Sequence, residues 1–232
     1  MNEQSTIFPV NEKTLPQLRI AEVSTCPSIH FFNVDCMDFM RSKPDKYYDL
    51  AIVDPPYGLG NKLAHAGNGQ NAQSKFSADF KNKNWDNKTP DDEYFIELFR
   101  VSKNQIIWGG NYFNLPPCRG FIVWDKMVYI PTMSRIEQAW TSFDKLPQLV
   151  QINNNDNNRI HLTQKPVKLY GWCLNRYAKS GMKILDTHGG SMTHAIACDI
   201  MGLDLDICEI DPEYFNNGLS KFKIHRLQKT LF

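Results

Sequence analysis

Strand-like apolar runs and helix-like amphipathic segments alternate near both ends of the chain. The apolar runs lie at 29–35, 47–54, 183–186 and 203–211. They are short and rich in Ile, Leu, Val and Phe, which is typical of buried strands. Helical patterns at 36–43 and 194–202 join the members of each pair, so each pair predicts a parallel βαβ unit with a right-handed crossover. Another helix is expected from Pro212, because proline favours the first turn.

The middle of the chain adds two helices and three strands. The expected helices are 90–102 and 165–181, the second ended by Gly181, and the expected strands are 104–110, 120–126 and 135–143. Two polar segments show neither period: 58–90, which is too long for a plain connection and predicts either a functional flap or disorder, and 144–159, which predicts a loop. This alternation predicts one α/β domain over 1–232, a three-layer sandwich with helices on both faces of its sheet.

Charge and cysteine content limit the classes of protein to which this chain can belong, but they do not identify a binding partner. A formal net charge of +1 neither indicates nor excludes nucleic-acid binding, because a basic face can exist within a neutral total. The six cysteines are Cys26, Cys36, Cys118, Cys173, Cys198 and Cys208. They form no C-x-x-C pair, which argues against a zinc site and a disulfide framework. With no signal-peptide pattern and no apolar run of membrane-spanning length, we expect a soluble cytoplasmic protein.

The motif DPPY follows the second apolar run, at a predicted carboxyl end of a strand, where open parallel sheets bind ligands. Pro55 and Pro56 lack N–H groups and have fixed φ, so they form a stiff segment that presents carbonyl acceptors. Asp54 adds a carboxylate and Tyr57 a flat aromatic face. Acceptors beside an aromatic platform suit the exocyclic amino group of a planar base.

A second unusual loop follows the strand at 183–186. The small residues Gly189, Gly190 and Ser191 allow a ligand to approach the backbone closely, and Glu209 ends the next strand, where an acid can bind ribose hydroxyls. This pairing favours a nucleoside-containing cofactor. The loop lacks G-x-G-x-x-G, which disfavours a nicotinamide dinucleotide. A tight turn followed by an exposed acid is the structural alternative.

Three motifs together resemble a known family. DPPY, then TQKP at 163–166, then the loop that opens with ILD are similar to the S-adenosylmethionine-dependent amino-methyltransferases of DNA. The order resembles the permuted beta class of N6-adenine methyltransferases, particularly its compact phage and orphan members, over about 31–215. The resemblance implies a circularly permuted, Rossmann-like class I sheet. Its first two strands would be 183–186 and 203–211, its third and fourth 29–35 and 47–54, and its fifth 104–110, followed by a terminal antiparallel hairpin.

The resemblance also implies roles for individual residues. The catalytic motif would be Asp54, Pro55, Pro56 and Tyr57. S-adenosyl-L-methionine would be held by Asp35, Cys36, Asp54, Thr163, Gln164, Lys165, Asp186, His188, Gly190, Ser191, Thr193 and Glu209. Within this set, Glu209 would hold the ribose, Asp35 and Cys36 would border the adenine, and Lys165 would meet the methionine carboxylate. A solvated lysine at the start of a helix is the structural alternative for Lys165.

The cofactor loop departs from the family pattern D-P-F-x-G-S-G-T-T, because this chain has DTHGGSMTH. Met192 replaces a glycine, and we expect it to crowd the approach of the cofactor to the backbone. His188 and His194 are expected to pack within the loop rather than to act as bases, and no metal is expected, since one histidine does not make a metal site.

The resemblance implies methyl transfer to the N6 amino group of adenine in double-stranded DNA after base flipping, as in restriction–modification and phage enzymes. Asp rather than Ser at the start of the motif favours adenine over cytosine N4. Target recognition is expected from 126–160 and from the flap, with Lys126, Lys145 and Arg159 on DNA, in a monomer or homodimer. The alternatives are an amino-methyltransferase for cytosine N4, RNA or protein, and a DNA-binding relic without catalysis.

Overall fold

A single eight-stranded sheet forms the centre of the computed structural model, which describes residues 26–60, 86–129, 134–154, 160 and 163–229. The strand order is β1-β8-β7-β2-β3-β5-β4-β6. The strands are β1 (Ile29–Phe32), β2 (Tyr48–Val53), β3 (Ser102–Trp108), β4 (Phe121–Asp125), β5 (Ile136–Thr141), β6 (Gln148–Gln151), β7 (Lys183–Asp186) and β8 (Asp204–Cys208).

Strands from the two ends of the chain are interleaved in this sheet. Strand β1 pairs with β8 in parallel, β8 with β7, and β7 with β2, so β7 and β8 separate the two strands of the first βαβ unit. Strand β2 also pairs in parallel with β3. Beyond β3 the direction changes, because β5 runs antiparallel to both β3 and β4. The expected α/β fold with an antiparallel hairpin is confirmed.

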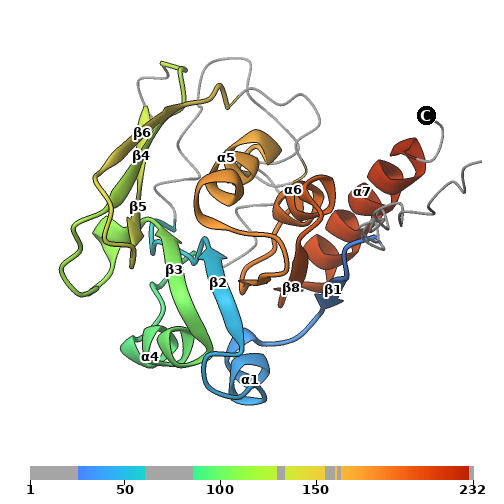
Figure 1. Cartoon of the computed structure of the whole chain (residues 1–232), viewed down its shortest axis with the longest axis horizontal. Coiled ribbons are helices and arrows are strands. Elements are labelled where there is room, and N and C mark those ends of the chain that lie inside the picture. Colours follow the sequence, from blue (N-terminus) through green and yellow to red (C-terminus); the bar gives the residue numbers. More distant parts are fainter. Residues whose placement is uncertain (1–25, 61–85, 130–133, 155–159, 161–162, 230–232) are drawn as a thin grey trace, which may run out of the picture.

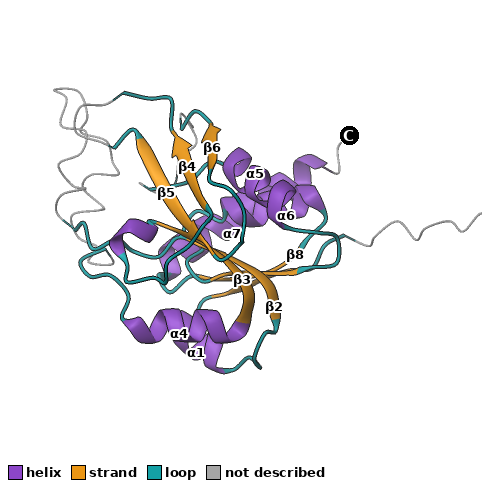
Figure 2. Cartoon of the chain, turned by 60° about the vertical axis from the view of Figure 1, so that its left-hand side comes forward, coloured by secondary structure: helices purple, strands orange, loops and turns teal. Residues whose placement is uncertain are grey.

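Helices cover both faces of the sheet. Helices α1 (Cys36–Arg41) and α4 (Asp92–Val101) lie on one face, and α5 (Val167–Tyr177), α6 (Thr193–Met201) and α7 (Pro212–Lys229) lie on the other (Figures 1 and 2). Successive side chains of a strand point to opposite faces. In β2, Leu50 and Ile52 join the core under α5 and α6, whereas Ala51 and Val53 join the core under α1 and α4. Burial on both faces explains the uninterrupted apolar run of this strand.

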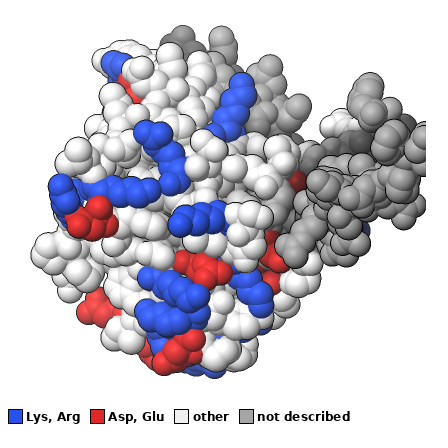
Figure 3. Space-filling model, in the orientation of Figure 1, with Lys and Arg blue, Asp and Glu red and all other residues white. Residues whose placement is uncertain are grey.

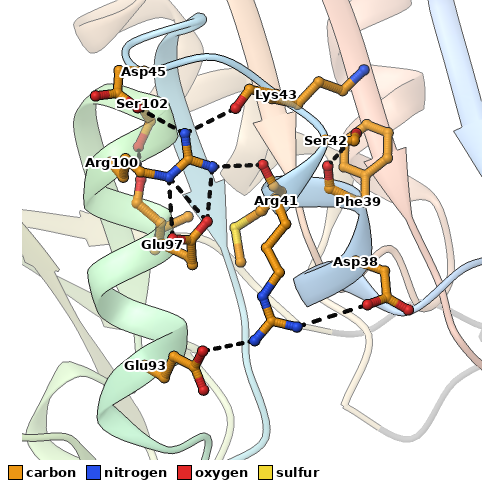
Figure 4. A network of polar contacts seen from close by, with 12 residues as sticks. Asp38, Phe39, Arg41, Ser42, Lys43, Asp45, Glu93, Glu97, Arg100 and Ser102 are labelled. Carbon is orange, nitrogen blue, oxygen red and sulfur yellow. Dashed lines mark hydrogen bonds and ion pairs between the residues drawn. The ribbon is translucent and has the colours of Figure 1, made fainter.

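Arg100 ties α4 to the connection between α1 and β2 (Figure 4). Its guanidinium donates to the carbonyl oxygens of Met40 and Lys43, both at 2.9 Å, and to the carboxylate of Asp45 at 2.8 Å. It also pairs with Glu97 one turn earlier on α4 at 2.8 Å. This network fixes the layer beneath the amino ends of β2 and β3.

Two predicted elements differ from the structure. Strand β6 lies within 144–159, where we expected only a loop, and it is an edge strand with Val150 as its one buried side chain. Helix α5 ends at Tyr177 instead of continuing to Gly181, because Ala178 is extended, with its N–H bonded to the Leu174 carbonyl. Among the described residues, no helix is both long and apolar enough to span a bilayer.

Candidate active site

The two loops singled out in the sequence lie side by side at the carboxyl edge of the sheet. Asp54 directly follows β2, Asp186 ends β7, and Glu209 directly follows β8. Because β2 pairs with β7 and β7 with β8, these three carboxylates belong to three adjacent strand ends. The structure therefore joins the amine-binding motif to the loop expected to bind a nucleoside.

Asp54 begins a chain of alternating charges inside the protein. One oxygen, Oδ2, lies 2.6 Å from Lys165 Nζ, and the same ammonium lies 3.1 Å from Glu137 Oε2 on β5. The other oxygen of Glu137 lies 2.6 Å from Lys126 Nζ, just after β4. Lys165 is only 4% exposed, so its ammonium is enclosed by the protein and is held by two partly buried carboxylates. A solvated lysine at the helix start is excluded.

The pKa values of the residues in this row of alternating charges depend on one another. Burial raises the pKa of Asp54 above its ordinary value, although Lys165 opposes the shift. Burial also works against the charge on Lys165, but the carboxylates of Asp54 and Glu137 outweigh it and raise the pKa of the ammonium. Glu137 is buried too, yet Lys165 and Lys126 lower its pKa. The pKa values of Asp54, Lys165 and Glu137 therefore each depend on the neighbouring charges.

Tyr57 closes the site on the other side of Asp54. Its hydroxyl donates to Asp54 Oδ1 at 2.5 Å and accepts from Lys165 Nζ at 3.2 Å. Tyr112, from the 3₁₀ turn η1 (Gly110–Tyr112), stacks on the Tyr57 ring with centroids 4.9 Å apart and planes 13° apart. Tyr112 is 44% exposed, so the stacked pair reaches the surface. An aromatic wall thus lies next to the carboxylate.

Asp86 holds the backbone that follows the motif. Its Oδ1 accepts from the N–H groups of Tyr57 at 2.7 Å and Gly58 at 3.0 Å, and its Oδ2 accepts from Leu59 N–H at 3.3 Å. Burial raises the pKa of Asp86, and these N–H donors oppose the rise. The segment 58–90 thus returns to support the motif; 61–85 lie outside the described residues.

Glu209 bridges the cofactor-type loop and the end of β8. Its Oε2 accepts from Gly190 N–H at 2.8 Å, and its Oε1 accepts from Asp211 N–H at 2.9 Å. Burial raises the pKa of this carboxyl group. Asn33, after β1, donates to the Glu209 carbonyl at 2.8 Å. Glu209 is therefore oriented by the loop and by β1 together.

The predicted cofactor residues cluster around this loop. Asp35 caps α1 by accepting from Met37 N–H at 2.7 Å, on the strand end next to Glu209. Burial raises the pKa of the neighbouring Cys36 thiol to about 12, so it stays protonated. On the other side, Thr193 donates its hydroxyl hydrogen to the Lys165 carbonyl at 2.9 Å and joins TQKP to the loop.

The histidines of the loop are packed among neighbouring side chains. His194 lies 2.9 Å from Asp186 Oδ2 and stacks on Tyr170, with centroids 4.4 Å apart. His188 Nδ1 lies 2.9 Å from Thr187 Oγ1, and burial lowers the pKa of its imidazole to about 4. His188 is therefore neutral near pH 7. The residues of the chain that are described contain no group of three or more His, Cys, Asp and Glu side chains arranged to hold a metal.

The expectation that Met192 crowds the loop needs correction. Met192 has the left-handed conformation, φ 56°, that glycine adopts most easily, but its side chain is fully buried. A Cβ placed on Gly218 of α7 would lie 2.3 Å from Met192 Cγ, and one on Gly189 would lie 2.7 Å from Met192 Sδ. The thioether thus lies between the loop and α7, in space that two glycines leave open.

The three basic residues expected to contact DNA, Lys126, Lys145 and Arg159, lie in different surroundings. Lys126 is 8% exposed and belongs to the buried charge chain. Lys145 donates to the Arg176 carbonyl near the end of α5, roughly 14 Å along that helix from its start at Val167. Arg159 lies outside the described residues. On the face in Figure 3, basic and acidic side chains are interspersed.

Three site residues were missed in the sequence: Glu137, Asp86 and Tyr112. Glu137 lies in the segment SRIEQAW, where a single acid interrupts a predicted strand, and that acid was the available signal. Asp86 lies in a polar stretch that offers no signal for its partners. Tyr112 follows two glycines after a predicted strand, an arrangement that indicates a turn at the same sheet edge.

Several solved structures have a fold similar to that of this chain. The chain is similar to M1.HpyAVI in complex with SAM (TM-score 0.52, 15% identity, 84% of this chain and 98% of that one). It is also similar to the cytosine-N4-specific PvuII DNA methyltransferase (0.58, 14%, 85% and 87%). A third similar structure is TTHA0409 of Thermus thermophilus, a proposed DNA modification methylase (0.53, 17%, 86% and 95%). The chain shares their fold. No family model matches the chain, and no curated protein does.

Proposed function

We propose that this protein transfers a methyl group from S-adenosyl-L-methionine to the N6 amino group of adenine in DNA. The observation that carries the proposal is the position of Asp54, an acceptor beside an aromatic wall, on the strand end adjacent to the glycine loop and Glu209. The fold shared with structures of DNA methyltransferases supports it.

The residues around the loop suit S-adenosyl-L-methionine. When bound, the cofactor would supply a methyl group on a positively charged sulfur. Glu209 would accept hydrogen bonds from ribose hydroxyls, and Asp35 and Cys36 would border the adenine ring. Gly190, whose N–H donates to Glu209, would allow close approach of the remainder, because no side chain projects from it. Lys165 is bound to Asp54 and Glu137, which does not support its expected contact with the methionine carboxylate.

Asp54 would perform the central task toward the target base. Adenine N6 is a poor nucleophile because its lone pair is delocalised into the ring. A carboxylate that accepts hydrogen bonds from the amine stabilises the positive charge that develops on the nitrogen during transfer. The stacked pair of Tyr57 and the exposed Tyr112 would form the aromatic wall for the base after it leaves the duplex, with unstacking costing a few kcal/mol.

Adenine specificity and the permuted beta class are the finer parts of the proposal. Asp at the first position of DPPY favours adenine over cytosine N4. The motif order, with β7 and β8 from the end of the chain inserted between β1 and β2, supports a permuted arrangement. A cytoplasmic enzyme of phage or restriction–modification type fits this reading.

A product analysis tests the reaction. The protein is incubated with double-stranded DNA and S-adenosyl-L-methionine carrying a labelled methyl group, and the DNA is digested to nucleosides. We expect label in N6-methyladenine. Label in N4-methylcytosine would overturn the adenine assignment, and label only in RNA or protein would overturn the DNA assignment. A protein that binds DNA but, in calorimetric titration, no S-adenosyl-L-methionine would be a relic without catalysis.

Substituting Asp54 tests the assigned residue. Asp54→Ala should reduce methylation by roughly a hundredfold or more, the scale for losing one group that stabilises developing charge. Asp91→Ala is the matched control, because Asp91 is exposed and forms an exposed ion pair with Lys88. Activity retained in Asp54→Ala protein with native circular dichroism would refute the role of Asp54.

A further inference from the structure

Glu137 and Asp54 share one buried ammonium group although they come from different strands. Lys165 Nζ lies 2.6 Å from Asp54 and 3.1 Å from Glu137, and its side chain is 3% exposed. The ammonium also lies 5.3 Å from the centroid of the Trp108 ring on β3. It is therefore enclosed by β2, β3 and β5, and its charge is divided between two carboxylates.

This division matters for the charge available on Asp54. A carboxylate paired with a lysine of its own would be largely neutralised, and it would stabilise a developing positive charge poorly. Glu137 draws part of the Lys165 charge away from Asp54. Lys126 lies 2.6 Å from the far oxygen of Glu137, and Lys165 together with Lys126 lowers the pKa of this carboxyl group against the effect of burial.

We propose that Glu137 is a positioning residue of the methyl-transfer reaction, which acts on Asp54 through Lys165. The inference rests on the proposed function, since it assigns a role within that reaction. By holding Lys165 from the side of β5, Glu137 keeps the ammonium on one oxygen of Asp54. Other lone pairs of the carboxylate are then available to the substrate amine, because an ionised carboxylate has about four acceptor sites.

Other titratable groups near Asp54 stay uncharged in the working range. Tyr57, on the same loop, has its pKa raised well above the ordinary value by burial and by Asp54. Tyr170, on α5, has its pKa raised by burial and by nearby carboxylates. Among the described residues, the charged groups that shift the pKa of Asp54 are therefore Lys165 and Glu137, with Lys126 next to Glu137.

The test is the pH dependence of kcat for DNA methylation by the full chain. Removing the negative charge in Glu137→Gln leaves Lys165 to Asp54 alone, which lowers the pKa of Asp54. The acid limb should therefore move about one pH unit lower, while kcat at neutral pH falls roughly tenfold. Lys126→Met removes a positive charge and frees Glu137 to attract Lys165, so its acid limb should move to higher pH.

Glu97→Gln is the matched control. Glu97, on helix α4, is also a glutamate in an ion pair, and its partner is Arg100 (Figure 4). This pair lies near the amino end of β2, whereas Asp54 follows the carboxyl end of that strand. Its profile should coincide with that of the unchanged protein. Thermal unfolding of each variant checks that the fold is kept.

The outcomes separate the two proposals. If the unchanged protein does not methylate DNA, the proposed function fails. If it does, and folded Glu137→Gln protein keeps the same kcat and acid limb, the role of Glu137 is overturned. Shifts of Glu137→Gln and Lys126→Met in the same direction would overturn it as well, because opposite charges must shift the limb oppositely.

Discussion

Gly109 determines where the Tyr57 ring can lie. It follows β3 with φ 70°, and a Cβ built on it would lie 2.2 Å from Tyr57 Cε1. Gly109→Ala should therefore displace the ring from Asp54. We expect methylation to fall by roughly a hundredfold, the scale for a displacement of about 1 Å at a reacting centre. Steady-state kinetics on a DNA substrate would measure the loss.

Gly181 is the control for this substitution. It has φ 80°, but no atom lies within 4 Å of a Cβ built on it. Gly181→Ala should lose about 1–2 kcal/mol of stability from the left-handed backbone alone, with unchanged activity. Equal loss of activity in both variants would show that backbone strain, not the Tyr57 ring, is responsible.

Met192 and Gly218 form a matched pair between the cofactor-type loop and α7. Met192→Ala should cost about 2–5 kcal/mol through the cavity it leaves. Met192→Gly should cost less than that alanine substitution by about 1 kcal/mol, because glycine relieves the left-handed backbone. Urea unfolding midpoints would show the difference. A glycine variant less stable than the alanine variant would contradict the strain at Met192.

Gly218→Ala should also destabilise the protein, by about 1–3 kcal/mol, since the new methyl group meets Met192. Gly171 on α5 is the control, because nothing lies within 4 Å of a Cβ built there. Gly171→Ala should stabilise the protein by up to about 1 kcal/mol through helix propensity. Stabilisation by both substitutions would contradict the contact expected between the new methyl group at position 218 and Met192.

Motif residues were predictable because their chemistry is local in sequence. DPPY, the glycine loop and Glu209 each stand at the end of a recognisable strand. The partners of the motif were not predictable, because they depend on contacts between distant segments. Lys165 reaches Tyr57 across 108 positions, and Asp86 reaches it across 29. Sequence spacing alone carries no signal for such contacts.

At the scale of elements, Arg100 joins three segments with one side chain. Arg100→Lys keeps the charge but loses the planar fork that serves two carbonyls and two carboxylates. We expect a loss of about 1–3 kcal/mol in urea unfolding, because buried carbonyls lose their donors. Methylation at saturating substrate should be unchanged.

Arg41→Lys is the comparison for that change. Arg41 makes an exposed ion pair with Glu93 between the same two helices. Exposed pairs contribute little, so its unfolding midpoint should stay within error of the parent. A larger loss at Arg41 than at Arg100 would contradict the assignment of stability to the carbonyl contacts.

The parallel strands were predictable because burial on both faces makes them continuously apolar, as in β2 and β7. Strand β6 escaped prediction because it lies at an edge, pairs with β4 alone and buries one side chain. The end of α5 was misplaced because Gly181 has the conformation of a helix cap while it belongs to the following turn. The positions of edge strands and helix ends are determined by contacts with neighbouring segments more than by the hydrophobic pattern of their own residues.

For the whole molecule, interleaving makes the two halves of the sheet interdependent. A chain shortened to residues 1–182 lacks β7 and β8, so β1 loses the strand it pairs with and β2 loses one neighbour. We expect this chain to lack a cooperative urea transition, whereas the full chain should unfold in one step seen equally by fluorescence and circular dichroism. A native-like transition in the shortened chain would contradict this dependence.

The same interleaving sets the order in which the site can form during synthesis on the ribosome. Asp54 and Tyr57 leave the ribosome early, together with the β2–β3 pair that can already form. Lys165 appears more than a hundred residues later, and Glu209 later still, with the strand that β1 requires. A nascent chain therefore displays an incomplete candidate site until β8 and Glu209 have emerged, and the two parts of the site can meet only from that point on.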